Sequence, residues 1–146
     1  MNLLSLTSFI VVVIFTTFLI YKIIQEIRDN YEDRNEDQYV LSLVKEIRSI
    51  DPAVDKVVDN LKFYAGNRSY TINKKNVYLC KNDENGVLYR KNQLVLVLIH
   101  EISHALCDEI GHTDKFNQIF DDLLEKAAKN EVYDPNIPHV SNYCQY

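Results

Sequence analysis

Glycine, proline and cysteine are scarce in this sequence, with three of each in 146 residues, and there is no tryptophan. So few glycines and prolines exclude collagen-like repeats and low-complexity linkers. Three cysteines are too few, and odd in number, for a scaffold built on disulfides. A formal net charge of −5 gives no global basic footprint, so nucleic acid is not an expected partner. Apolar residues make up 47% and charged residues 25%, which indicates a globular chain.

The apolar residues are concentrated at the N-terminus. From Leu3 to Tyr21 there is no charged residue, and most positions are Leu, Ile, Val or Phe. As a helix, such a run of roughly 19 residues crosses about 30 Å of hydrocarbon. A cleaved signal peptide would have a basic start and small residues at its cleavage site, and this run has neither. We therefore predict an uncleaved membrane anchor over residues 1–21; a buried core helix is the plainer alternative.

The charged residues that flank this run predict its orientation. The N-terminal flank has no Lys or Arg, whereas Lys22, Arg28 and Arg34 follow the run. The positive-inside rule then places the rest of a single-pass protein on the cytosolic side. Asn67-Arg68-Ser69, an acceptor triplet for N-glycosylation, points to the opposite side. Residues 22–37 mix acids and bases and are expected to form a juxtamembrane linker or a solvated helix.

Residues 38–146 are expected to form one α+β domain. Helical spacing covers residues 39–50, and Asp51-Pro52 starts a second short helix that runs to about Val58. Three short strands follow, at residues 61–65, 70–72 and 77–80. Two longer helices come next, one over residues 93–108 and one that begins at Thr113 or Asp114. After Asn130 we expect an irregular tail.

The chemistry-bearing motif is His100-Glu101-Ile102-Ser103-His104, an H-E-x-x-H pattern on a predicted helix. Residues i and i+4 share one face of a helix, so both imidazoles can reach one metal ion. Zinc lowers the pKa of its bound water, and Glu101 can take that proton and pass it to the leaving amine. The plainer alternative is a helix with two surface histidines. The apolar run before the motif argues against it, because such a helix faces an interior or a cleft.

A zinc hydrolase uses three protein ligands and keeps one position open. The third ligand can be His112, His139 or Glu125 of the following helix. Gly111 can end the preceding helix in a left-handed turn, which would bring His112 back to the metal.

His100-Glu101-x-x-His104 followed by Gly111-His112-x-x-x-Phe116 resembles the SprT-like and WLM group of zincin metalloproteases. The resemblance covers about residues 60–125. It implies a minimal zincin-like fold, His112 as the third zinc ligand, Phe116 as a packing aromatic, and proteolysis. Metzincins are excluded, because position 107 is Cys and no Met follows Met1. The SprT-like group cleaves proteins crosslinked to DNA through further DNA-binding parts. This sequence has an anchor instead, so we expect membrane-proximal protein substrates.

Other residues near the motif have weaker indications. Cys107 can shield or contact the zinc, or be a small buried hydrophobe. Asp108 can accept a hydrogen bond from a ligand histidine, and Ser103 is expected only to pack. Three tail tyrosines can stabilise an oxyanion or simply lie at the surface, and His139 is expected to be exposed; the tyrosines are Tyr133, Tyr143 and Tyr146.

The sequence therefore predicts a membrane-anchored zinc metalloprotease that hydrolyses peptide bonds through a zinc-bound water activated by Glu101. The predicted partners are the membrane, contacted by residues 3–21, and a polypeptide substrate that pairs with Val77–Cys80 as an edge strand. The first alternative is a catalytically inert, zinc-stabilised interaction module tethered to a membrane. The second is a helical membrane protein with incidental histidines and no metal.

Overall fold

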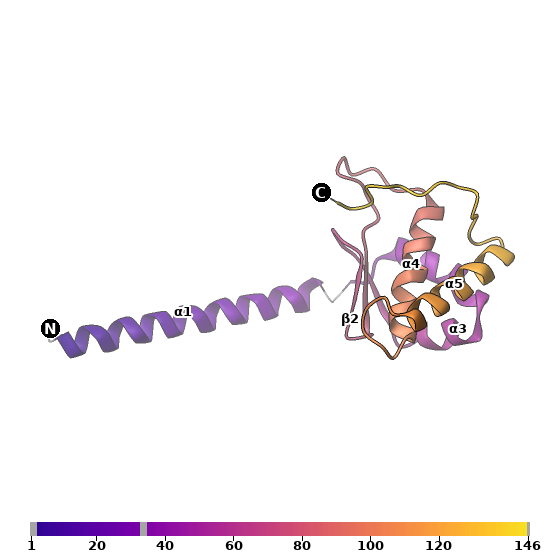
Figure 1. Ribbon diagram of the computed structural model, residues 1–146. Helices are drawn as coiled ribbons and strands as arrows, with labels where there is room; N and C mark the ends of the chain where they lie inside the picture. Colours follow the sequence, from indigo (N-terminus) through magenta and orange to yellow (C-terminus); the bar gives the residue numbers. More distant parts are fainter. Residues whose placement is uncertain (1–2, 33–34, 146) are drawn as a thin grey trace. The chain divides into compact units, whose positions relative to one another are not determined.

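The computed structural model describes residues 3–32 and 35–145. The chain divides into two compact units, Met1–Asn35 and Glu36–Tyr146. The first unit contains one long helix, α1 (Leu3–Glu32), drawn in indigo and violet in Figure 1. The helix continues past Tyr21 into the mixed-charge stretch, because nothing there breaks it: the next proline is Pro52.

Helix α1 is long and apolar enough to cross a membrane. Its window Phe9–Glu26 has a mean hydropathy of 1.9, and the side chains of that window are not buried. Thr16 and Thr17 donate their hydroxyl hydrogens to the carbonyl oxygens of Val13 and Ile14. These hydroxyls therefore have partners without water, as a lipid environment requires. A signal sequence near the N-terminus can also be long and apolar enough to meet this criterion.

The second unit begins with two capped helices, α2 (Gln38–Ile47) and α3 (Pro52–Val58), which a 3₁₀ turn over Arg48–Ile50 connects. The Asp37 carboxylate accepts from the backbone N–H groups at the start of α2. Asp51 does the same for α3, with Pro52 at the first helical position as predicted. The expected helix over residues 39–50 thus tightens in its last turn. Its apolar face still enters the core.

Three short strands form one sheet: β1 (Lys62–Ala65), β2 (Tyr70–Ile72) and β3 (Asn76–Leu79). Their order is β1-β3-β2, with β3 parallel to β1 and antiparallel to β2. All three predicted strands are confirmed. The expectation that Val77–Cys80 offers a free edge to substrate is wrong, because β3 is the central strand and is hydrogen-bonded on both sides. The two outer strands of the sheet are β1 and β2.

Helix α4 (Lys91–Leu106) lies at the centre of the second unit and contacts the sheet, α2, α3 and α5 (Asp114–Lys129) (Figure 1). Its core face is fully buried and consists of Leu94, Val95, Leu98, Ile99 and Ile102. The Thr113 side chain accepts from the Phe116 N–H and caps α5. Because α4 touches nearly every element, residues on it are held by the whole domain.

The C-terminal tail, residues 130–145, is irregular as predicted, but it is fastened to the domain. Cys144 forms a disulfide with Cys80 at the end of β3, with a Cα–Cα distance of 6.3 Å. The backbone N–H of Val140 donates to the side-chain oxygen of Gln93. The cysteine count gave no indication of this bridge, because two cysteines separated by 64 residues have no recognisable spacing.

Candidate metal centre

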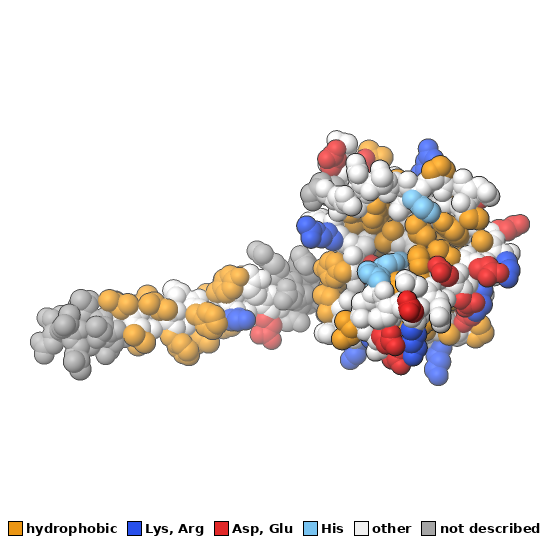
Figure 2. Space-filling model, in the orientation of Figure 1, with side chains coloured by type: hydrophobic (Ala, Val, Ile, Leu, Met, Phe, Trp, Pro, Cys, Tyr) orange, Lys and Arg blue, Asp and Glu red, His pale blue; other side chains and the backbone are white. Residues whose placement is uncertain are grey.

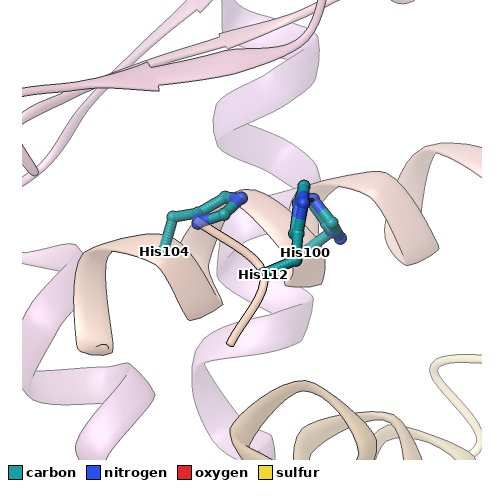
Figure 3. A group of neighbouring side chains, drawn as sticks. All are labelled: His100, His104 and His112. Atoms are coloured by element: carbon teal, nitrogen blue, oxygen red, sulfur yellow. Dashed lines mark hydrogen bonds between the residues drawn. The ribbon is translucent and has the colours of Figure 1, made fainter. Parts of the chain in front are cut away.

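The three histidines singled out by the sequence lie together in the structure. His100 and His104 stand one turn apart on α4, and His112 comes from the loop that follows the helix (Figure 3). Their ligand-capable nitrogens all lie within 4.8 Å of one another. The Nε2 atoms of His100 and His112 are 3.0 Å apart. The i, i+4 spacing therefore produces the shared face that it predicts.

The loop that carries His112 differs in detail from the expectation. Helix α4 ends at Leu106, two residues before the predicted end, and Cys107 takes an extended conformation. The Lys74 ammonium donates to the Cys107 carbonyl oxygen, a favourable place for a cation at a helix C-terminus. Gly111 does adopt a positive φ of 85°, but it does so inside the loop rather than as a helix cap. The chain then turns back, and His112 faces α4.

One aromatic side chain supports all three imidazoles. Phe116 of α5 is 1% exposed. Its ring centroid lies 4.9 Å from that of His100, 4.2 Å from that of His104 and 4.9 Å from that of His112. Phe120, one turn later, contacts His100. Packing against rigid rings restricts the orientations of the imidazoles, so the cluster is preorganised. Phe116 is also the packing aromatic that the family resemblance implies.

The surroundings of His100 and His104 favour the neutral form of each imidazole. Burial, and then repulsion from His104 and His112, lowers the pKa of His100 to about 4. Burial, His112 and Lys74 likewise lower the pKa of His104. A metal ion binds the neutral form of imidazole, so at neutral pH these two histidines would need no deprotonation to bind one. Three imidazole nitrogens also match the ligand type and number of catalytic zinc sites.

Glu101 lies beside the cluster in a buried position, with 4% of its surface exposed. The hydroxyl of Thr71, on β2, lies 2.8 Å from Glu101 Oε2 and 3.1 Å from the Glu101 carbonyl oxygen, and donates to them. Burial raises the pKa of the carboxyl to about 7, although the Thr71 hydrogen bond acts in the opposite direction. A carboxyl with a pKa near neutrality is suited to accept and return a proton. The sequence gave no signal for Thr71, because its proximity to Glu101 arises only when β2 packs on α4.

The two alternative third ligands lie elsewhere. Glu125 is exposed on α5 and forms an ion pair with Lys129 one turn further on. His139 is exposed, as expected, and its Nε2 lies 3.2 Å from the hydroxyl of Tyr133. Neither residue belongs to the histidine cluster, so within residues 3–32 and 35–145 His112 completes the group of three.

The structure also shows the surroundings of Cys107, Ser103 and Asp108, for which the sequence suggested minor roles. Cys107 is fully buried with a free thiol outside the cluster, as expected of a small hydrophobe. Ser103 is buried and donates to the carbonyl oxygen of Ile99, so it packs as predicted. Asp108 is exposed and paired with Lys115, which lowers the pKa of the Asp108 carboxyl. Asp108 therefore does not support a ligand histidine.

The tail tyrosines do not simply lie at the surface. Tyr133 is 7% exposed, and the hydroxyl of Tyr143 bonds to Ser69 and to the Cys80 carbonyl oxygen. Both side chains line a cavity that also reaches His100 and Glu101. The expectation of surface tyrosines is thus wrong for Tyr133, because the tail folds back on the domain. Tyr146 lies outside the described residues.

The chain is similar to viral proteins. It is 44% identical over 91 residues to Uncharacterized protein 136R of Invertebrate iridescent virus 6, which covers 60% of this chain and 51% of that protein. It is 45% identical over 89 residues to Uncharacterized protein 042R of Invertebrate iridescent virus 3, covering 60% and 56%. An uncharacterized protein of Acanthamoeba polyphaga mimivirus is 31% identical over 80 residues, covering 53% and 40%.

The matched part thus spans about half the length of these relatives. No family model matches the chain. No solved structure matches it either. The names of the relatives state no activity, so a function has to be argued from the site itself.

Proposed function

We propose that this protein is a membrane-anchored, zinc-dependent metalloprotease of the SprT-like and WLM type. Zinc is held by His100, His104 and His112, and Glu101 is the general base. The observation that carries the proposal is the convergence of three imidazoles beside one buried carboxyl on the same helix. The loop position of Gly111-His112 and the packing of Phe116 against the imidazoles support the family assignment.

The residues of the site divide the reaction between them. When bound, zinc supplies a Lewis acid that polarises the peptide carbonyl and lowers the pKa of a water at its open position. Glu101 takes a proton from the attacking water, whose oxygen bonds to the carbonyl carbon. The C–N bond breaks, and Glu101 returns the proton to the departing amine. One water is consumed, and a carboxylic acid and an amine are formed; at neutral pH the acid passes its proton to the amine, which gives a carboxylate and an ammonium group. Thr71 holds one oxygen of Glu101 and leaves the other to carry the proton.

The direct test is metal analysis of the full chain in detergent, with casein as a general substrate. We expect about one zinc per chain, as for a site with a single ion. Casein cleavage should stop when a chelator removes the metal and should return when zinc is restored. Zinc bound tightly without cleavage would instead support the inert, membrane-tethered interaction module. The buried Glu101 argues against that module, because a structural zinc site needs no base. A protein that binds no metal would contradict both.

Thr71 provides a test of how Glu101 is positioned. Thr71→Val keeps the shape of the side chain but removes the donor to Glu101 Oε2. We expect kcat to fall about 10-fold or more, since a hydrogen bond to a charged group contributes about 1.5–3 kcal/mol. The Thr71 bond lowers the pKa of Glu101, so the acidic limb of the pH–rate profile should move to higher pH without it. Thr71→Ser, which keeps the hydroxyl, should restore both; an unchanged profile in Thr71→Val would contradict this role.

The membrane topology is a further part of the proposal. Helix α1 supports attachment through residues 3–21, and the flanking Lys and Arg predict a cytosolic domain. Two features of the structure argue for the other side: disulfides persist in oxidising compartments, and Asn67 of the glycosylation triplet is exposed. We therefore expect the domain on the non-cytosolic side of the membrane.

Expression of the full chain in animal cells tests this topology. We expect a glycan that an N-glycosidase removes and that Asn67→Gln abolishes. Cys80 and Cys144 should resist alkylation until they are reduced, while Cys107 becomes reactive on unfolding alone. If the chain carries no glycan and all three cysteines are alkylated without reductant, the domain lies on the cytosolic side and the proposed topology is wrong.

A further inference from the structure

Two cavities of unequal size meet at the candidate metal centre. The larger, of about 960 Å³, extends from His100 and Glu101 along the N-terminal half of α4 towards the C-terminal tail. We call it the tail-walled pocket. The smaller, of about 400 Å³, lies on the side of His104, His112 and Lys74. Both cavities include His100, Glu101 and Ser69. A peptide whose scissile bond lies at Glu101 therefore has one cavity on each side of that bond.

The tail-walled pocket is lined mainly by apolar side chains. Leu96 and Val97 stand on α4, one turn before His100, and Phe120 and Leu124 face them from α5. All four are only half-buried, so their apolar surface is open to a ligand. In Figure 2, orange hydrophobic side chains lie between two groups of pale-blue histidine side chains on the visible face. The polar side chains that line the pocket include Arg68 and His139.

The opposite wall is the C-terminal tail, and several bonds hold it in place. Tyr133, Tyr143 and Cys144 contribute to the lining. Cys144 is bonded to Cys80, and its backbone N–H donates to the hydroxyl of Tyr89. The backbone N–H of Asp134, at the other end of the tail, donates to the side-chain oxygen of Asn92. The tail is thus tied at both ends, and the pocket has a fixed wall.

We propose that the tail-walled pocket receives a bulky apolar side chain of the substrate, aromatic or long aliphatic, next to the bond that is cleaved. This inference rests on the proposed function and adds the chemical class of the substrate segment. The pocket shares Glu101 with the reaction site, so a side chain inside it is adjacent to the reacting carbonyl. Its apolar surface favours the desolvation of an apolar side chain, and outside the reaction site its basic side chains are Arg68 and His139.

The first test maps cleavage sites in a peptide library by mass spectrometry. For the wild type we expect enrichment of Phe, Tyr, Leu and Met at one position beside the cleaved bond. Leu124→Trp and Val97→Phe narrow the pocket from two different walls, and both should shift the preference to smaller residues. Leu88→Trp, at an exposed leucine outside this lining, should keep the original preference. Efficient cleavage without any apolar preference would overturn the inference and leave the proposed protease intact.

The second test needs no turnover and compares two zinc-binding probes, acetohydroxamate and 3-phenylpropanohydroxamate, by calorimetry on the zinc-loaded full chain. We expect the phenyl compound to bind about 10-fold or more tightly, because its ring leaves water for an apolar cavity. Leu124→Trp should remove this advantage and leave acetohydroxamate binding unchanged, which also shows that the variant is folded. Equal affinities in the wild type would contradict the pocket assignment alone. If neither probe binds, the metal has no open coordination position, and both the proposed protease and the pocket assignment are contradicted.

Discussion

Glu101→Gln is expected to lower kcat for casein or peptide hydrolysis by about 10²–10⁴-fold, the usual contribution of a general base. Gln has nearly the same shape as Glu and can still accept a hydrogen bond from Thr71, but it cannot take a proton from water. Glu101 is also separate from the three histidines that form the cluster. Zinc content should therefore stay near the wild-type value. Retention of full activity would remove Glu101 from the mechanism, and loss of zinc would mean that Glu101 helps to hold the metal.

The free energy of unfolding of metal-free Glu101→Gln provides a control, because the pKa of Glu101 predicts whether the variant is more or less stable than the wild type. Burial raises the pKa of Glu101 in the folded protein from 4.5 to about 7. Protonation of Glu101 therefore contributes fully to the free energy of unfolding below pH 4.5, and this contribution is lost as pH rises through 7. Gln does not titrate, so above pH 7 metal-free Glu101→Gln should be more stable than the metal-free wild type, by about 1–3 kcal/mol. Thermal unfolding at pH 5 and pH 8 measures the difference, which should shrink at the lower pH.

His112→Ala is expected to weaken zinc binding about 100-fold or more. Loss of a residue that only hydrogen-bonds to a metal ligand lowers metal affinity about 10–100-fold. His112 itself supplies one of the three ligands in the proposed site. The Nε2 of His112 lies 3.0 Å from that of His100. Without His112, only the two imidazoles on α4 remain in the cluster. Competition with a chromogenic chelator measures the affinity, and peptide hydrolysis should fall with zinc occupancy.

Matched controls distinguish His112 from the other two predicted candidates. His139→Ala removes an exposed histidine that bonds Tyr133, and Glu125→Ala removes an exposed carboxylate paired with Lys129. Both variants should bind zinc as the wild type does. If either loses affinity while His112→Ala does not, the third ligand has been assigned to the wrong residue.

Local patterns in the sequence were sufficient for most of the elements. Hydrophobic spacing and the capping residues Asp51 and Thr113 located the helices. The i, i+4 spacing of His100 and His104 placed both on one face of α4, because helix geometry is a local property. The end of α4 was less certain from sequence, since the chain leaves the helix where Lys74, from another element, binds the Cys107 carbonyl oxygen.

The sequence by itself determined the apolar N-terminal helix, the α+β order of the domain and the histidine pair with Glu101, since each depends on residues close together in the chain. Only the tertiary structure decided that His112 rather than His139 or Glu125 joins the pair, and that β3 is the central strand of the sheet rather than an edge strand. It also decided that Thr71 holds Glu101 and that Cys144 fastens the tail beside His100. These relations depend on how loops, strands and the tail fold back on α4, and such folding leaves no periodic signal in the sequence.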